Sequence, residues 1–290
     1  MEKTKKKKRK SNNAADAWKL FRKNKAAMAG LVVLAVFVFF ALFADLLIPY
    51  EAAVIQSPKD RLMAPCMQHW LGTDEFGRDM LMRILWSIRS SLFMGALSIA
   101  LSCIVGGLFG AIAGYYGGKL DNVIMRIMDV FLAIPSMLLA IAIVAAFGTS
   151  LVNVLLAIGI SYVPTFARTV RAPILTVKGQ DYIEAAKAVG ASDFRIIFKY
   201  ILPNSMAPII VQVTLGVAGA ILSIAGLSFL GLGIQPPTPE WGAMLSGARS
   251  YIRSSWHITV IPGLAIMLTI LALNVMGDGL RDALDPRLKN

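Results

Sequence analysis

Long apolar runs constrain this chain more than any other feature of its sequence. Several approach or exceed the roughly 20 residues that a helix needs to cross the hydrocarbon core of a bilayer. The 290 residues are 57% hydrophobic and 16% charged, whereas a soluble domain carries about 25% charged residues. Little of the chain remains for a separate soluble domain. The sequence therefore predicts an all-α integral membrane protein.

The apolar runs divide into six predicted membrane-spanning helices. Their expected bounds are residues 26–48, 92–115, 123–147, 151–166, 207–230 and 258–276. Pro135 should kink the third helix, because proline lacks the N–H that a helix interior needs, and the short fourth helix should end near Pro164. The transmembrane domain, residues 26–290, then contains outer loops at 50–91 and 231–257 and an inner loop at 167–204.

The net charge of +12 is concentrated at the amino terminus, where residues 1–25 form a basic tail. Such a tail before an apolar span keeps its end cytoplasmic and can contact anionic membrane lipid. Six crossings then place both termini in the cytoplasm. Nucleic-acid binding is the weaker interpretation of the same charge, so no nucleic-acid partner is expected.

The last part of the tail, residues 14–25, has the pattern of an amphipathic interfacial helix. Trp18 and Phe21 are expected to anchor this helix in lipid, while its basic residues stay among the headgroups.

One face of the second predicted span carries a small residue at every fourth position. These residues are Ser98, Ser102, Gly106, Gly110 and Gly114. Association of helices in lipid depends on close van der Waals approach, which small residues permit. This span should therefore pack tightly against another helix, either of this chain or of a partner.

The inner loop predicts a hairpin of two short helices. Alanines favour the first helix, and Gly190 should end it in the left-handed conformation. Ser192 or Asp193 should cap a second helix at residues 194–200, which Pro203 should stop. The hairpin could lie on the membrane surface, but its charges interrupt any wide apolar stripe. Docking into a protein groove, with close approach through the small residues Ala185, Ala186 and Gly190, is therefore the favoured interpretation.

This hairpin resembles the EAA loop of permease subunits of ATP-binding-cassette (ABC) importers. The matching residues are Glu184, Ala185, Ala186, Gly190, Leu202 and Pro203. Tyr200 stands where many members carry an aliphatic residue, so no role is carried over to it. The resemblance implies that the hairpin engages an ATPase subunit and transmits its closure to the membrane helices.

Other segments resemble the C-type permeases of dipeptide and oligopeptide importers. They are residues 18–31, 69–79 (HWLGTDEFGRD), 230–242 (LGLGIQPPTPEWG) and 277–282 (GDGLRD). The expected outer-loop motif comprises Gly72, Thr73, Asp74, Gly77, Arg78 and Asp79. The resemblance covers nearly all of the chain after the basic tail, and it implies a type I importer-permease fold in a bacterial cell membrane.

Few residues in the sequence could support catalysis, so the chain is not expected to be an enzyme. Its sequence contains no G-x-x-x-x-G-K-[ST] loop for nucleotide phosphates. We expect no cofactor in this chain, with ATP and Mg²⁺ bound by two partner ABC ATPase subunits. His69 and His257 are expected to be solvated loop residues rather than metal ligands, and Cys66 and Cys103 isolated thiols.

Asp74 and Arg78 are the sharper candidates in the first outer loop. An ion pair between them would fold the loop, and contact with an external binding protein or with substrate is the alternative role. Glu240 and Trp241, in the second outer loop, are weaker candidates of the same kind.

The predicted function is that of a permease subunit in an ATP-driven importer of di- and oligopeptides. By resemblance, a second homologous permease forms the other half of the pathway, and an extracytoplasmic substrate-binding protein delivers the cargo. Relatives in the family carry nickel chelates, opines or short saccharides, and the loop motifs do not separate these cargoes. An ion-coupled carrier is the alternative of another class. It would need membrane-embedded acids or paired discontinuous helices, and the sequence shows no clear case of either.

Overall fold

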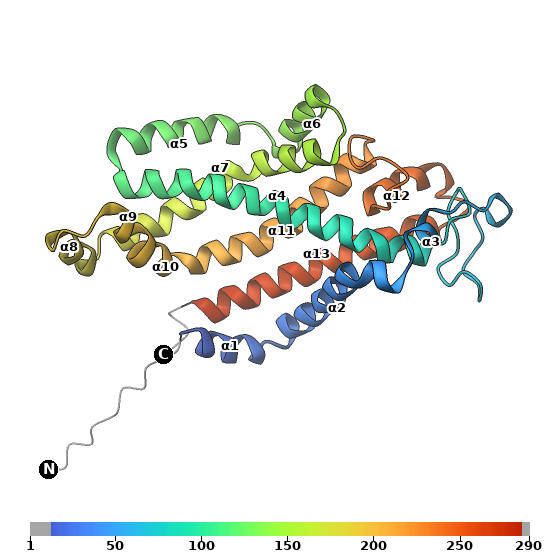
Figure 1. The fold of residues 1–290 in the computed structure, drawn as a ribbon, viewed down its shortest axis with the longest axis horizontal. Helices are drawn as coiled ribbons and strands as arrows, with labels where there is room; N and C mark the ends of the chain where they lie inside the picture. Colours follow the sequence, from blue (N-terminus) through green and yellow to red (C-terminus); the bar gives the residue numbers. More distant parts are fainter. Residues whose placement is uncertain (1–12, 286–290) are drawn as a thin grey trace, which may run out of the picture.

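The computed structural model describes residues 13–285, whose regular structure is helical apart from one β-bridge between Thr73 and Asp79 (Figure 1). The run of lysines at residues 5–8 lies outside the described residues. The helices are α1 (Asn13–Lys23), α2 (Lys25–Leu47), α3 (Tyr50–Val54), α4 (Met80–Tyr116), α5 (Gly118–Leu132), α6 (Ser136–Phe147), α7 (Leu151–Lys178), α8 (Asp181–Ala188), α9 (Asp193–Ile196), α10 (Leu202–Asn204), α11 (Met206–Phe229), α12 (Trp241–Ala248) and α13 (His257–Leu284). Shorter turns are η1 (Pro58–Asp60), the π-helical η2 (Ile197–Ile201) and η3 (Arg249–Tyr251).

Five of these helices, α2, α4, α7, α11 and α13, are long and apolar enough to cross a membrane within the described residues. Helices α5 and α6 make a sixth crossing when they are counted as one broken span, bent by 83°. The expected kink at Pro135 is thus a break, because this proline stands before the first turn of α6 with extended backbone angles. The prediction of an all-α membrane protein is confirmed.

Helix α4 begins at Met80, well before the expected start at residue 92, so the outer loop is shorter than the predicted 50–91. The Asp79 carboxylate starts the helix by accepting hydrogen bonds from the backbone N–H groups of Leu81 and Met82, at 2.8 and 3.1 Å. At 37 residues, the helix is about 55 Å long and extends beyond a hydrocarbon core of about 30 Å.

Two further helix ends differ from the predictions. Helix α7 continues through Pro164 and Pro173 to Lys178, so the inner loop does not begin at residue 167. Helix α13 contains Pro262 and continues to Leu284 rather than to residue 276. Neighbouring helices in a membrane protein compensate for the hydrogen bonds that proline removes, and both helices pack along their length against others.

The second outer loop, predicted at residues 231–257, contains a helix that folds back onto the protein. Helix α12 places Trp241 and Met244 in a core cluster with residues of α2, α4, α11 and α13. The structure therefore covers the outer ends of these helices with a packed element rather than with an extended loop.

The predicted amphipathic helix at residues 14–25 is present as α1, but its apolar face meets protein. The Phe21 side chain is 3% exposed and packs with Ala27 and Ala283. Trp18 is 49% exposed. The expectation that Phe21 anchors in lipid is therefore wrong, because the end of α13 covers it.

The small residues of α4 lie on the face that contacts α7. A Cβ atom added to Gly106 would lie 2.4 Å from the Val163 carbonyl oxygen, and one added to Gly110 would lie 2.3 Å from that of Ala167. The Ser102 hydroxyl donates a hydrogen bond to the Gly159 carbonyl at 2.6 Å. The backbones of α4 and α7 thus approach as closely as glycine permits.

Different helices and loops lie at the two ends of the helix bundle. Helix α1, the end of α13 and helices α8–α10 lie at one end of the bundle, whereas α3, α12 and the loop before α4 lie at the other (Figure 1). We call these the inner and outer ends. Two ion pairs hold α5 against α7 towards the inner end, Arg171–Asp121 and Arg168–Asp129, each at 2.6 Å.

Candidate functional site

The inner hairpin, residues 181–204, begins with a helix whose end is defined by glycine. Gly190 has a φ of +80°, a conformation that L-residues other than glycine rarely adopt. Its N–H donates to the Lys187 carbonyl at 2.9 Å, and the Ala191 N–H donates to the Ala186 carbonyl at 3.1 Å. These two bonds form a Schellman motif, which turns the chain sharply out of α8.

The second part of the hairpin is longer than the sequence predicted. Ser192 caps it by accepting a hydrogen bond from the Arg195 N–H at 3.4 Å. The helical conformation then passes through η2 into α10, which contains Leu202 and Pro203. This helical run ends at Asn204, one residue beyond Pro203, and Ser205 separates it from α11.

Isoleucines form the interior of the hairpin. Ile183, Ile196 and Ile201 are fully buried and join Ile174 of α7 and Tyr115 of α4 in one apolar cluster. The hairpin is therefore packed onto the inner ends of α4 and α7 rather than suspended from two flexible connections.

The outer surface of the hairpin combines charge with uncovered apolar side chains. Glu184 and Ala185 are exposed, but Ala186 is only 9% exposed and belongs to the interior cluster. Of the residues expected to approach a partner closely, Ala186 thus faces the hairpin core. Four large apolar side chains are exposed instead: Tyr182 (45%), Val189 (84%), Phe194 (71%) and Phe198 (53%).

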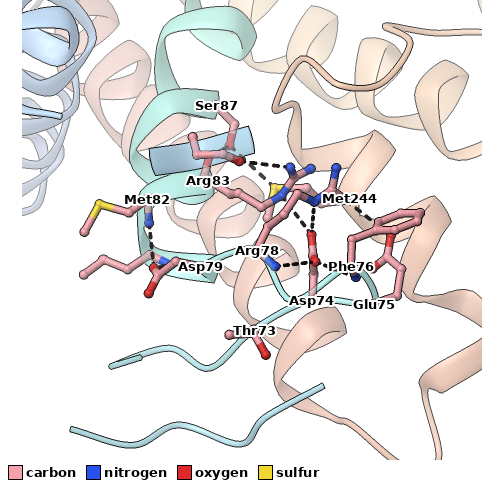
Figure 2. A network of polar contacts seen from close by, with 12 residues as sticks. Thr73, Asp74, Glu75, Phe76, Arg78, Asp79, Met82, Arg83, Ser87 and Met244 are labelled. Atoms are coloured by element: carbon pink, nitrogen blue, oxygen red, sulfur yellow. Dashed lines mark hydrogen bonds and ion pairs between the residues drawn. The ribbon is translucent and has the colours of Figure 1, made fainter. Parts of the chain in front are cut away.

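At the outer end, a buried carboxylate organises the loop before α4 (Figure 2). Asp74 Oδ2 lies 2.6 Å from Arg78 Nε, and Asp74 Oδ1 accepts hydrogen bonds from the backbone N–H groups of Phe76 and Arg78, at 2.8 and 3.0 Å. Arg83 Nε makes an ionic contact with Asp74 Oδ2 at 3.3 Å without a hydrogen bond. All three charged side chains are about 5% exposed.

The other motif residues complete this outer network. His69 Nδ1 lies 2.8 Å from the Asp79 carboxylate, and His257 Nε2 lies 3.0 Å from the Thr73 carbonyl oxygen. His257 is 2% exposed, so the expectation of a solvated loop histidine is wrong at this position. A Cβ on Gly77 would lie 1.8 Å from the Ser57 carbonyl oxygen, which explains why the turn requires glycine.

The glycine at the start of the motif has a similar constraint. Gly72 has a φ of +75°, and a Cβ there would lie 2.5 Å from the Met63 carbonyl oxygen and 2.7 Å from the His257 ring. The structure thus brings all six residues of the outer motif into one folded loop, packed against the first turn of α13.

A cavity of about 440 Å³ lies between this loop and α12. Its walls include Glu75, Arg78, Arg83, Met244 and Tyr251. Burial raises the pKa of the Glu75 carboxyl above its ordinary value, and Asp74 adds to this effect.

Glu240 immediately precedes α12 and is 1% exposed. Its carboxylate caps α12 by accepting hydrogen bonds from the N–H groups of Gly242 and Ala243, at 2.9 and 2.8 Å. Burial nevertheless raises the pKa of Glu240, because desolvation outweighs these two bonds.

Sequence reasoning missed two residues that the geometry makes prominent. Arg83 joins the outer network from α4, whereas the sequence placed it in the outer loop among other charged residues, where nothing singled it out. Tyr115 joins the hairpin cluster at the other end of α4, and no spacing in the sequence marked it.

Comparison with known proteins identifies the class of molecule that has this architecture. Residues 106–290 match the family "Binding-protein-dependent transport system inner membrane component". Residues 13–65 match the N-terminal transmembrane domain of oligopeptide transport permease C.

Individual relatives agree with these matches over most of their length. The dipeptide transport system permease protein DppC of Alkalihalophilus pseudofirmus is 50% identical over 275 residues, covering 95% of this chain and 90% of that protein. The di/tripeptide permease DppC of Pseudomonas aeruginosa is 47% identical, with 94% and 92% covered. The glutathione permease GsiD of Pectobacterium atrosepticum is 47% identical, with 94% and 91% covered.

A solved structure shows the same fold. A chain of the MetNI methionine ABC transporter, in an inward-facing conformation, aligns with a TM-score of 0.59 at 18% identity, covering 71% of this chain and 98% of that one. The chain therefore belongs to the dipeptide and oligopeptide permease family of binding-protein-dependent ABC importers, which are multi-pass proteins of the bacterial inner membrane.

Proposed function

We propose that this chain is a permease subunit that carries di- and oligopeptides into the cell, as part of an ATP-driven, binding-protein-dependent importer. The observation that carries the proposal is its identity of 47–50% to permeases named for dipeptides, di/tripeptides and glutathione. The shared cargo class of these relatives is the short peptide. Peptides are therefore favoured over metal chelates, opines or saccharides.

The hairpin is the proposed contact with the ATPase subunits. It exposes Glu184 and four large apolar side chains at the end of the molecule that we assign to the cytoplasm. Exposed apolar groups outside a membrane favour burial against a protein partner. Because the sequence has no phosphate-binding loop, ATP and Mg²⁺ are assigned to two partner ATPases. A second homologous permease forms the other half of the pathway.

The outer end is the proposed side of peptide entry. The Asp74 network keeps the outer loop folded, and this loop with α12 forms the surface available to an external binding protein. The small-residue face of α4 is used within this chain, against α7, so it is not assigned to the second permease.

The test uses the full complex reconstituted in proteoliposomes with its second permease, ATPases and binding protein. Glu184→Lys should lower peptide uptake and stimulated ATP hydrolysis by about tenfold or more, because a reversed charge in a docked interface costs several kcal/mol. Glu51→Lys is the matched control, since it makes the same change on an exposed residue of α3 at the outer end.

Two results would contradict the proposal. Normal uptake by the Glu184→Lys complex, at an unchanged level of inserted protein, would exclude docking through the hairpin. Peptide uptake by this chain alone, driven by a proton gradient without ATP, would identify an ion-coupled carrier instead.

A further inference from the structure

Tyr115 occupies the last turn of α4, at the junction with the inner hairpin. Its side chain is 4% exposed and lies in the cluster formed by the hairpin isoleucines. The adjacent Tyr116 is 53% exposed. One tyrosine of the pair is therefore enclosed by protein, whereas the other is largely uncovered.

Three separate segments meet the enclosed tyrosine. The Tyr115 hydroxyl donates a hydrogen bond to Asp193 Oδ1, in the first turn of α9, at 2.5 Å. Lys187 of α8 places its Nζ 5.6 Å from the centre of the Tyr115 ring. Lys178, the last residue of α7, places its Nζ 5.8 Å from the same centre. Cations at this distance from an aromatic ring are attracted to it.

The hydrogen bond between Tyr115 and Asp193 links the hairpin directly to α4. Within residues 13–285, it is the only hydrogen bond or ion pair that joins a side chain of α8–α10 to α4. Helix α4 then continues without interruption to Met80, beside the outer network. A movement of the hairpin thus has one hydrogen bond through which it can reach α4 directly.

We propose that Tyr115 is a positioning residue that couples the hairpin to α4, so that a displacement of α8 and α9 by the ATPase moves the inner end of α4 with it. The proposal rests on the proposed function, because it requires that an ATPase moves the hairpin. It adds the residue pair, Tyr115 and Asp193, that passes the movement to the membrane-spanning helix.

The experiment compares variants of this pair in the reconstituted full complex. Tyr115→Phe removes the hydroxyl and keeps the aromatic ring near the two lysines. Asp193→Ala removes the acceptor from an exposed residue, which makes it a second route to the same loss if Tyr115→Phe accumulates poorly. Asp193→Asn is the conservative variant, since its amide oxygen still accepts the hydrogen bond. Tyr116→Phe is the matched control.

Four quantities are measured for each variant: retention of the ATPase subunits, basal ATP hydrolysis, stimulation of hydrolysis by peptide-loaded binding protein, and peptides imported per ATP. Tyr115→Phe and Asp193→Ala should keep ATPase retention and basal ATP hydrolysis at the wild-type level. Their stimulation and import per ATP should fall about tenfold, the size expected for losing one hydrogen bond to a charged group. Asp193→Asn and Tyr116→Phe should behave nearly as the wild type.

The double variant Tyr115→Phe/Asp193→Ala should be no worse than either single variant, because both remove the same interaction. Wild-type stimulation and import per ATP in Tyr115→Phe would overturn the inference and leave the proposed function intact. Loss of ATPase retention in Tyr115→Phe would also overturn it, because the residue would then build the docking surface. A wild-type complex that neither holds ATPases nor uses ATP would instead refute the proposed function.

Discussion

Asp74 shows how single residues organise the outer end. Its buried carboxylate accepts hydrogen bonds from two backbone N–H groups and contacts two buried guanidinium groups. A buried ion pair adds little stability over an apolar replacement, but removing one partner leaves a charge stranded. The network therefore acts mainly to fix one loop conformation. This makes a structural role the stronger interpretation of the outer motif.

Buried acids at the outer end predict a specific dependence of stability on pH. Burial raises the pKa of Glu240 above its ordinary value of 4.5, so the folded protein binds this proton more tightly than the unfolded chain. Stability should then fall as the pH rises from that ordinary value to the raised pKa, by at most about 1.4 kcal/mol per pH unit. Burial also raises the pKa of Glu75, so its ionisation should lower the stability of the folded protein in the same way.

Glu240→Gln should flatten this profile, because the amide keeps an acceptor for the α12 cap and does not ionise. The measurement is the unfolding midpoint of the detergent-solubilised protein across this pH range. Glu51→Gln, on an exposed residue, is the control and should leave the profile unchanged. A Glu240→Gln profile as steep as that of the wild type would show that another group is responsible.

Local spacing predicted part of the outer site. The four-residue separation of Asp74 and Arg78 in a glycine-containing turn was enough to suggest the ion pair. Arg83 and His257 come to the same loop only through the positions of α4 and α13. No local pattern encodes such contacts, which is why His257 was expected in solvent.

Among the elements, the contact between α4 and α7 gives the sharpest test. A Cβ at Gly110 would lie 2.3 Å from a backbone oxygen of α7, whereas a Cβ at Gly107 would meet only a Val170 methyl group at 3.8 Å. Gly110→Ala should destabilise the protein by about 1–3 kcal/mol, because overpacking forces the backbones apart. Gly107→Ala, three residues away, should have little effect.

Unfolding midpoints and the yield of folded protein in detergent measure the difference between these two variants. Equal midpoints would mean that α4 and α7 separate at no cost, contrary to the close contact described above.

The apolar runs predicted the existence of the membrane-spanning helices better than they predicted where each helix ends. The bounds of α2 and α11 fall within a residue of the predictions. Helix α7 passes two prolines that would stop an isolated helix, and α12 lies within a loop that reads as turn-forming sequence. Tertiary packing decides both cases, and a single sequence does not display it.

For the whole molecule, the arrangement of inner and outer ends predicts which sites are accessible from each side of the membrane. Cys66 lies in the outer loop, and Cys103 lies within the apolar part of α4. In spheroplasts with a sealed inner membrane, a membrane-impermeant maleimide should label the wild-type protein but not the Cys66→Ser variant. A Ser192→Cys change in the Cys66→Ser background should be labelled only after the membrane is opened.

Labelling of the Ser192→Cys variant before the membrane is opened would contradict the assignment of the hairpin to the cytoplasmic side. The Cys66→Ser protein without the added cysteine is the control, and it should stay unlabelled under both conditions because Cys103 is embedded in the bilayer.

The unusual length of α4 has a mechanical consequence. If this continuous helix of about 55 Å tilts as a rigid body by about 5° about its inner end, Met80 at its outer end moves by about 5 Å. At the outer end, the Ser87 hydroxyl of α4 lies 3.7 Å from the Met244 sulfur of α12, beside the cavity of about 440 Å³. A tilt of this size would displace the outer end of α4 by more than the Ser87–Met244 contact distance, so this contact and the cavity beside it are the places where such a tilt would be felt most strongly.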